Sequence, residues 1–226
     1  CDALVSQDLY SKVKVLMPVF GKSSEESMAA LQYFMGRGRI KTFYSDKAPE
    51  LKKVCKTLNI GYEHSQPGRP QNNSIIERTN LDILEGTRTL MICAGFPECF
   101  WPFAAPHYCF LENTSLLGSD GKVRTEGSPY YRAHQKGETD ALRLPFGCEV
   151  IFMPSSTKGL PHEKWEGTAE TGVIAGYRMN PGYVWGGEYL CWSLNELVGI
   201  DMRVKADRYP PGLQNPHVTK RIRLPE

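Results

Sequence analysis

The sequence predicts a mixed α/β fold followed by a small all-β part. Short apolar strands alternate with amphipathic helices up to about residue 115, Gly, Ser, Asp and Thr crowd residues 113–128, and short strand patterns with Gly-rich turns follow. We therefore expect an α/β domain over residues 1–115, a β-rich domain over 116–200, and a basic, Pro-containing, extended tail over 201–226.

The α/β part begins with a predicted β-hairpin and then alternates helices and strands. Apolar residues at every second position from Val13 to Val19 indicate a strand, and a polar turn at 8–12 joins it to an earlier strand. Ser23 or Ser24 is the expected cap of the first helix, which carries two glutamates in its first turn. The elements expected here are strands at 3–5, 13–19 and 40–44, and helices at 24–34 and 49–58.

The next segment is expected to be a loop followed by two helices. Residues 61–73 are rich in Gly, Pro and Asn, which favours a loop. An apolar stripe predicts a helix from Ser74 to Ala94, with Glu77 in its first turn. A second helix is expected over 97–111, kinked at Pro106. Strand patterns at 146–154, 171–179 and 188–194 then predict a small antiparallel barrel or meander.

The composition is that of an ordinary globular protein, with 41% hydrophobic and 23% charged residues among 226. The apolar runs are short and broken by charges, so the sequence predicts no membrane-spanning segment. Seven cysteines without CxxC spacing indicate neither a zinc knuckle nor a disulfide framework.

Positive charge is concentrated in residues 36–80, where nine Lys and Arg stand against four Asp and Glu. The whole chain carries a formal charge of only +2. A basic segment around a few carboxylates is typical of proteins that bind a polyanion. A solvated, charged helix face over 51–57 is the alternative interpretation.

Asp46 and Glu77 are the candidate metal ligands. Phosphodiester chemistry commonly uses two divalent cations about 4 Å apart, held by carboxylates, and Mg²⁺ prefers hard oxygen ligands. Asp46 follows a predicted strand, and Glu77 lies near the start of a helix after a polar loop. Each could instead have a structural role, Asp46 as a turn cap and Glu77 as a partner of the helix dipole.

The segment YSDKAPELKKVCKTLNIGYEHSQPGRPQNNSIIERTN resembles the second half of the catalytic core of retroviral and copia-type retrotransposon integrases. Downstream, FWPFAAPHYCFLEN resembles the helix pair of that family, and RLPFGCEV and KWEGTAETGVIAGYRM resemble the copia-type segment after the core. The resemblance extends from residue 3 to about residue 200. The matching residues are Ser45, Asp46, Glu50, Leu51, Gly61, His64, Ser65, Pro67, Pro70, Gln71, Asn72, Glu77 and Arg78.

The resemblance implies a ribonuclease H-like fold, a mixed sheet flanked by helices, whose first strand is missing here. It also implies an Asp-Asp-Glu triad that uses Mg²⁺ or Mn²⁺ for 3′-end processing and strand transfer of DNA. Asp46 corresponds to the second member and would bind both metals. Glu77 corresponds to the third member, would bind one metal, and would help to position the nucleophile. The first Asp is expected to lie outside this chain, and neither Asp2 nor Asp8 occupies its place.

Several residues beside these carboxylates are candidates for DNA contacts. Lys47, Arg69 and Arg78 would meet phosphates, and Gln71, Asn72 and Asn73 would hydrogen-bond sugars or base edges. A polar, solvated loop is the alternative for these residues. The family also implies element ends and target DNA as partners, a homo-oligomer, and a location in the nucleus or a virus-like particle.

The chain departs from the family pattern at Lys47-Ala48, where the family has Asn-Gly, and at Ser74, where it has Gly. The spacing from Asp46 to Glu77 is also shorter than the family norm. These departures leave open whether the chain is an enzyme. The alternatives are a catalytically inactive nucleic-acid-binding remnant of a mobile element and an unrelated ribonuclease H-like nuclease.

Overall fold

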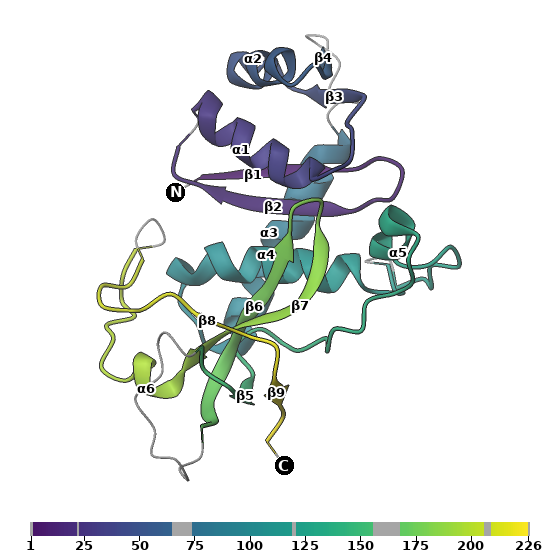
Figure 1. Cartoon of the computed structure of the whole chain (residues 1–226). Coiled ribbons are helices and arrows are strands. Elements are labelled where there is room, and N and C mark those ends of the chain that lie inside the picture. Colours follow the sequence, from purple (N-terminus) through teal and green to yellow (C-terminus); the bar gives the residue numbers. More distant parts are fainter. Residues whose placement is uncertain are drawn as a thin grey trace.

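The computed structural model describes residues 2–21, 23–64, 74–118, 121–155, 168–205 and 209–225. The first half contains β1 (Asp2–Gln7), β2 (Lys14–Val19), α1 (Ser24–Met35), β3 (Thr42–Ser45), α2 (Pro49–Thr57), β4 (Gly61–His64), α3 (Ser74–Ala94) and α4 (Trp101–Asn113). The second half contains α5 (Pro129–His134), β5 (Glu149–Phe152), β6 (Glu170–Asn180), β7 (Val184–Ser193), α6 (Leu194–Leu197), β8 (His217–Thr219) and β9 (Ile222–Arg223). The predicted mixed α/β class with a β-rich C-terminal part is confirmed (Figure 1).

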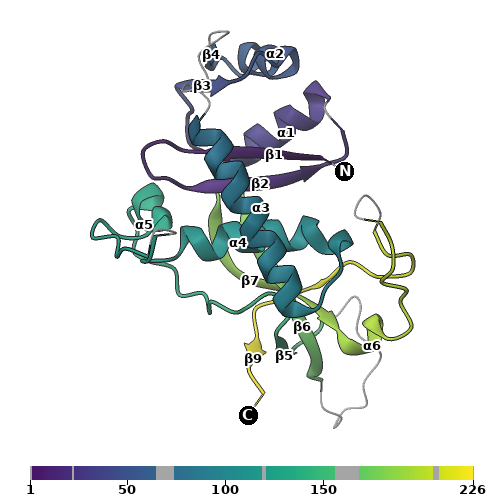
Figure 2. The ribbon, with the colours of Figure 1, turned by 180° about the vertical axis from the view of Figure 1, so that it is seen from behind.

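The β1–β2 hairpin lies between two helices. β1 and β2 pair antiparallel, and α1 and α3 lie on opposite sides of them, as the two opposite views show (Figures 1 and 2). Ser23 caps α1, because its side chain accepts a hydrogen bond from the Glu26 N–H at 3.2 Å. Within the described ranges, every helix is too short or too polar to cross a lipid bilayer.

The prediction of a loop throughout residues 61–73 is wrong for its first four residues. Residues 61–64 form β4, which pairs in parallel with β3. The sequence pattern does not predict this strand, because only Tyr62 among its residues is large and apolar. The strand is stabilised instead by its backbone hydrogen bonds to β3 and by the hydrogen bond of the Tyr62 hydroxyl. Residues 65–73 lie outside the described residues.

The C-terminal sheet has the strand order β8-β7-β6-β5-β9. β8 and β9 occupy opposite edges, yet only Lys220 and Arg221 separate them in the sequence. In a flat sheet these edges would lie about 19 Å apart, whereas the three steps from Thr219 to Ile222 reach at most about 11 Å. The sheet must therefore curl until the 217–223 segment bridges both edges, as in a small barrel. In Figure 1 this segment crosses over β6 and β7.

Helix α4 packs against both the hairpin and the C-terminal sheet. Ala105 and Cys109 on one side pack with Leu16 of β2 and Ile83 of α3. Phe100, at the start of α4, packs with Trp192 of the sheet. The helix runs without a break through Pro106. α4 therefore links the two parts through shared hydrophobic cores, and the predicted division near residue 115 remains a prediction.

The tip of the β6–β7 hairpin makes a second connection between the two parts. The Gly182 N–H donates to the Tyr33 carbonyl at 2.7 Å, and the Tyr33 hydroxyl donates to the Met179 carbonyl. A Cβ atom on Gly36 would lie 2.5 Å from Gly182 Cα, so the two backbones meet where neither has a side chain. This contact holds the hairpin against the end of α1.

Candidate metal and nucleic-acid site

Asp46 lies directly after β3, at a point fixed by hydrogen bonds to its own carbonyl. The Ser45 hydroxyl, the Tyr62 hydroxyl and the Ala48 N–H donate to this oxygen at 2.6, 2.7 and 2.8 Å. The Asp46 side chain is exposed. The end of β3 is thus held rigidly while the carboxylate stays available to a ligand.

Glu77 lies in the first turn of α3 and is exposed. A negative charge is favourable there because the free N–H groups of a helix amino end carry partial positive charge. Two residues further along, the Thr79 hydroxyl donates to Gln7 Oε1 at 2.9 Å. This bond ties the start of α3 to the end of β1 and fixes the helix turn that carries Glu77.

Both carboxylates line the same groove, a cavity of about 1690 Å³ between β1, β3 and α3. Three basic residues that the sequence analysis did not select, Arg39, Lys41 and Arg88, also line it. Arg39 and Lys41 belong to the basic 36–80 segment. Arg88 lies eleven residues after Glu77, which places it three helical turns along the same face of α3, and this spacing could have identified it.

The described residues do not complete a metal site. Among them, no group of three or more His, Cys, Asp and Glu side chains is arranged to hold a metal ion. Asp8 lines the groove, but its Oδ2 accepts hydrogen bonds from the Ser11 N–H and hydroxyl at 2.7 and 2.6 Å. Asp2 is not among the groove residues. Two oxygen ligands of the expected kind are present, and they are too few for a two-metal centre.

The candidate DNA contacts are only partly described. Lys47 follows Asp46, Arg78 follows Glu77, and both are exposed. Arg69, Gln71, Asn72 and Asn73 lie outside the described residues. Neither Lys47 nor Arg78 is among the residues that line the groove with the two carboxylates, so the structure shows only that these two predicted contacts are exposed.

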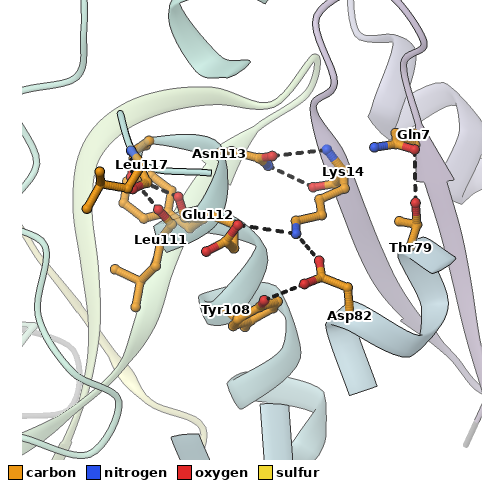
Figure 3. Close-up of polar contacts among 12 residues, drawn as sticks. Gln7, Lys14, Thr79, Asp82, Tyr108, Leu111, Glu112, Asn113 and Leu117 are labelled. Carbon is orange, nitrogen blue, oxygen red and sulfur yellow. Dashed lines mark hydrogen bonds and ion pairs between the residues drawn. The ribbon is translucent and has the colours of Figure 1, made fainter. Parts of the chain in front are cut away.

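A partly buried polar network holds α3 against β2 and α4 (Figure 3). The Lys14 ammonium pairs with Asp82 of α3 and lies 3.5 Å from Glu112 of α4. The Tyr108 hydroxyl donates to Asp82 at 2.9 Å, and burial raises the pKa of this phenol. Asn113 accepts from the Lys14 N–H at 3.0 Å and donates to the Lys14 carbonyl at 2.7 Å. Every charged member has a partner, so the network fixes the helix that carries Glu77.

Curated relatives of the chain are retrovirus-related Pol polyproteins of plant transposons. It is 36% identical over 66 residues to the Pol polyprotein of transposon TNT 1-94 from Nicotiana tabacum. It is 33% identical over 118 residues to that of transposon RE1 from Arabidopsis thaliana, and 33% identical over 78 residues to that of RE2. The chain resembles part of a retroelement Pol polyprotein. The resemblance drawn from its motifs is thereby confirmed.

These matches cover 29%, 49% and 33% of the chain and only 5%, 7% and 5% of the three Pol polyproteins. No family model matches the sequence. Among solved structures, the chain is similar to the catalytic core domain of BIV integrase, with a TM-score of 0.43, 17% identity, and coverage of 56% of this chain and 80% of that one. A chain in the structure of the simian T-cell lymphotropic virus intasome in complex with PP2A regulatory subunit B56 gamma gives a TM-score of 0.48, 16% identity, and coverage of 82% of this chain and 64% of that one.

Proposed function

We propose that the chain is the part of a retroelement integrase that carries two of its three catalytic carboxylates. In the intact parent, the reaction would be 3′-end processing of DNA followed by strand transfer into target DNA. The observation that carries this proposal is that Asp46 and Glu77, chosen from the motifs, line one groove of the structure. The similarity to Pol polyproteins also supports it.

Mg²⁺ or Mn²⁺ is the proposed cofactor, because the two side chains in question offer carboxylate oxygens. The metal would supply charge stabilisation and an activated nucleophile. A third carboxylate has to join Asp46 and Glu77 before such a centre can form. The rigid ends of β3 and α3 would hold the two carboxylates in place for it.

DNA is the proposed partner, as element ends and as target. The groove residues Arg39, Lys41 and Arg88 are exposed, and their charges would meet phosphates along a strand lying over the carboxylates. We further propose that the intact parent acts as a homo-oligomer in the nucleus or in a virus-like particle.

A catalytically inactive, nucleic-acid-binding remnant is the second candidate. The lack of a third ligand among the described residues favours it. The reading frame upstream of Cys1 separates the two candidates. An Asp at the end of an apolar strand pattern there supports the active parent, whereas a stop codon or unrelated sequence supports the remnant.

DNA binding can be tested by fluorescence anisotropy over a range of salt concentrations. Replacing two of the three groove cations, Lys41→Gln with Arg88→Gln, is expected to weaken binding at low salt and to reduce the salt slope by about 1.8. The matched control, which also removes two charges, is Lys136→Gln with Lys205→Gln, two exposed lysines outside the groove. Equal losses in the double variant and the control would contradict the placement of DNA along this groove.

A further inference from the structure

One face of α3 is turned away from the rest of the molecule. The side that packs against the molecule carries the buried residues of the helix, which are Thr79, Ile83, Thr87 and Met91. The opposite side, here called the outer face of α3, carries four exposed residues, Leu81, Glu85, Arg88 and Ile92. α3 runs behind β2 and α4 in Figure 1 and in front of them in Figure 2. The outer face is therefore open to a partner.

The residues of the outer face have the spacing of a two-helix coiled coil. They follow one another at intervals of four, three and four residues, which is the spacing of alternating d and a positions in a heptad. On an α-helix they lie within about 60° of one another. Leu81 and Ile92, at the two ends, are 53% and 79% exposed. Single exposed apolar residues are ordinary, but residues in heptad spacing form a face that another helix can pack against.

The order of these residues makes the outer face complementary to itself. In an antiparallel pair centred on the middle of the face, a positions of one helix meet d positions of the other. Leu81 of each copy then meets Ile92 of the other, and Glu85 of each copy meets Arg88 of the other. A parallel pair in register would instead place Glu85 against Glu85 and Arg88 against Arg88, and like charges oppose that arrangement. The charges therefore select the antiparallel pair.

The two charged side chains are available for these contacts. In the part of the chain that the structure describes, neither Glu85 nor Arg88 takes part in an ion pair. Charged or polar residues at a and d positions lower the stability of a coiled coil but specify its register. The face spans only about 17 Å of helix, so the contact is smaller than the roughly 1200 Å² of stable complexes. A weak pairing that depends on concentration is therefore expected.

We propose that the outer face of α3 is a docking surface for a second copy of this chain, with the two α3 helices antiparallel and Glu85 of each copy paired with Arg88 of the other. The inference goes beyond the homo-oligomer proposed for the intact parent, because it names the surface and the register and concerns the chain by itself. Arg88 also lines the groove, so DNA that contacts Arg88 would compete with the second copy.

Charge reversal tests the pairing. Sedimentation velocity of the chain, without DNA or metal, is expected to show a reversible dimer between about 10 µM and about 1 mM. Glu85→Arg and Arg88→Glu each turn two attractive pairs into repulsive ones, and each should raise the dissociation constant at least about tenfold. The double variant and an equimolar mixture of the two single variants should both restore the dimer to within about threefold, because every pair again joins opposite charges.

A control and the contrary outcomes complete this experiment. Lys52→Glu reverses an exposed charge on α2 and should leave the dissociation constant unchanged. A chain that stays monomeric, a dimer that either single reversal leaves intact, or reversals that neither combination restores would overturn the proposal. Because the experiment contains no DNA or metal, such a failure would leave the proposals on the carboxylates and on DNA binding standing.

Disulfide cross-linking tests the orientation of the two helices. The background is Cys93→Ser, because Cys93 is exposed next to Ile92. Leu81→Cys mixed with Ile92→Cys should give a covalent dimer on mild oxidation. Either variant alone should give roughly a tenth as much, because its thiols would lie about 16 Å apart along the antiparallel helices, beyond the reach of a disulfide. Equal cross-linking of a single variant and of the mixture would overturn the antiparallel register.

Discussion

The side chain of Lys14 is buried, although the alternating pattern of its strand predicts an exposed side chain at this position. Alternation from Val13 to Val19 predicts that Lys14 points to solvent, but only 8% of Lys14 is exposed. The pattern fails because helices cover both faces of β2: Val13 packs in one cluster and Leu16 in another. The partners of Lys14 lie 68 and 98 residues away, and no local pattern reveals such pairs.

Replacing Lys14 with Met should lower the free energy of unfolding by about 2 kcal/mol, because the partly buried Asp82 loses its cation and Glu112 keeps only Arg124, 3.7 Å away. Urea unfolding measures this loss. Lys52→Met, at an exposed position of α2, is the control and should change stability by less than about 0.5 kcal/mol. A loss no larger than that of the control would mean that the Lys14 network contributes nothing to stability.

The burial of the His107 imidazole leads us to predict that the stability of the fold depends on pH. It is 1% exposed, its Nε2 lies 2.9 Å from the Leu144 carbonyl, and burial lowers its pKa to about 4. The unfolded state, with an imidazole pKa of about 6.5, therefore takes up a proton before the folded state does. The contribution of neutral His107 to the free energy of unfolding is fully present above pH 6.5. It is lost as the pH falls toward 4, by up to about 1.4 kcal/mol per pH unit. His107→Gln should flatten this part of the profile; a profile identical to that of the unmodified chain would exclude His107 as its source.

Among the elements, the contact between Gly36 and Gly182 determines how the β6–β7 hairpin meets α1. Gly36→Ala should cost about 2 kcal/mol, because a Cβ atom there meets the Gly182 backbone. Gly187→Ala is a matched control: its φ of +78° is similarly unfavourable for alanine, but no atom lies within 4 Å of the new Cβ. Thermal unfolding of both variants checks the difference. Equal losses of stability in the two variants would mean that the unfavourable backbone conformation alone, and not the contact with Gly182, causes the loss.

β3 and β4 show what the sequence predicts about the site and what it does not. The strand before Asp46 and the helix that carries Glu77 follow from apolar patterns, since β3 packs Phe43, partly buried, against α1 and α2, and α3 buries Ile83 and Met91. β4 does not follow from an apolar pattern, because its polar residues are held by pairing with β3, a strand sixteen or more residues away in the sequence. Its Tyr62 nevertheless fixes the Asp46 carbonyl. Sequence motifs thus identified the two carboxylates, whereas the residues that fix the backbone beside them, such as Tyr62, are recognised only in the tertiary structure.

In the whole molecule, α4 and the β6–β7 hairpin join the two parts into shared cores. We therefore predict a single cooperative unfolding transition. Tryptophan fluorescence, to which Trp192 of the sheet contributes, should change at the same urea concentration as far-ultraviolet circular dichroism, to which α3 and α4 contribute. Two separated transitions would show instead that the parts unfold independently.

The architecture of the C-terminal part was only partly predictable. Strand patterns predicted β5, β6 and β7, because these strands carry apolar residues that pack in the core, in β6 on both faces. β8 and β9 are short, and their partners are the outer edges of β7 and β5. Closure of the sheet by the 217–223 segment depends on these long-range pairings, which periodicity along the chain does not contain.

The central claim, an integrase-type site that lacks one carboxylate, is tested most directly by a strand-transfer assay with Mg²⁺. The chain alone should give no detectable product. The chain extended by the upstream residues of its reading frame, if these supply an Asp on an apolar strand, should give product that disappears in Asp46→Asn and in Glu77→Gln. Robust Asp46-dependent product from the chain alone would contradict the claim, as would product from the extended chain that survives both substitutions.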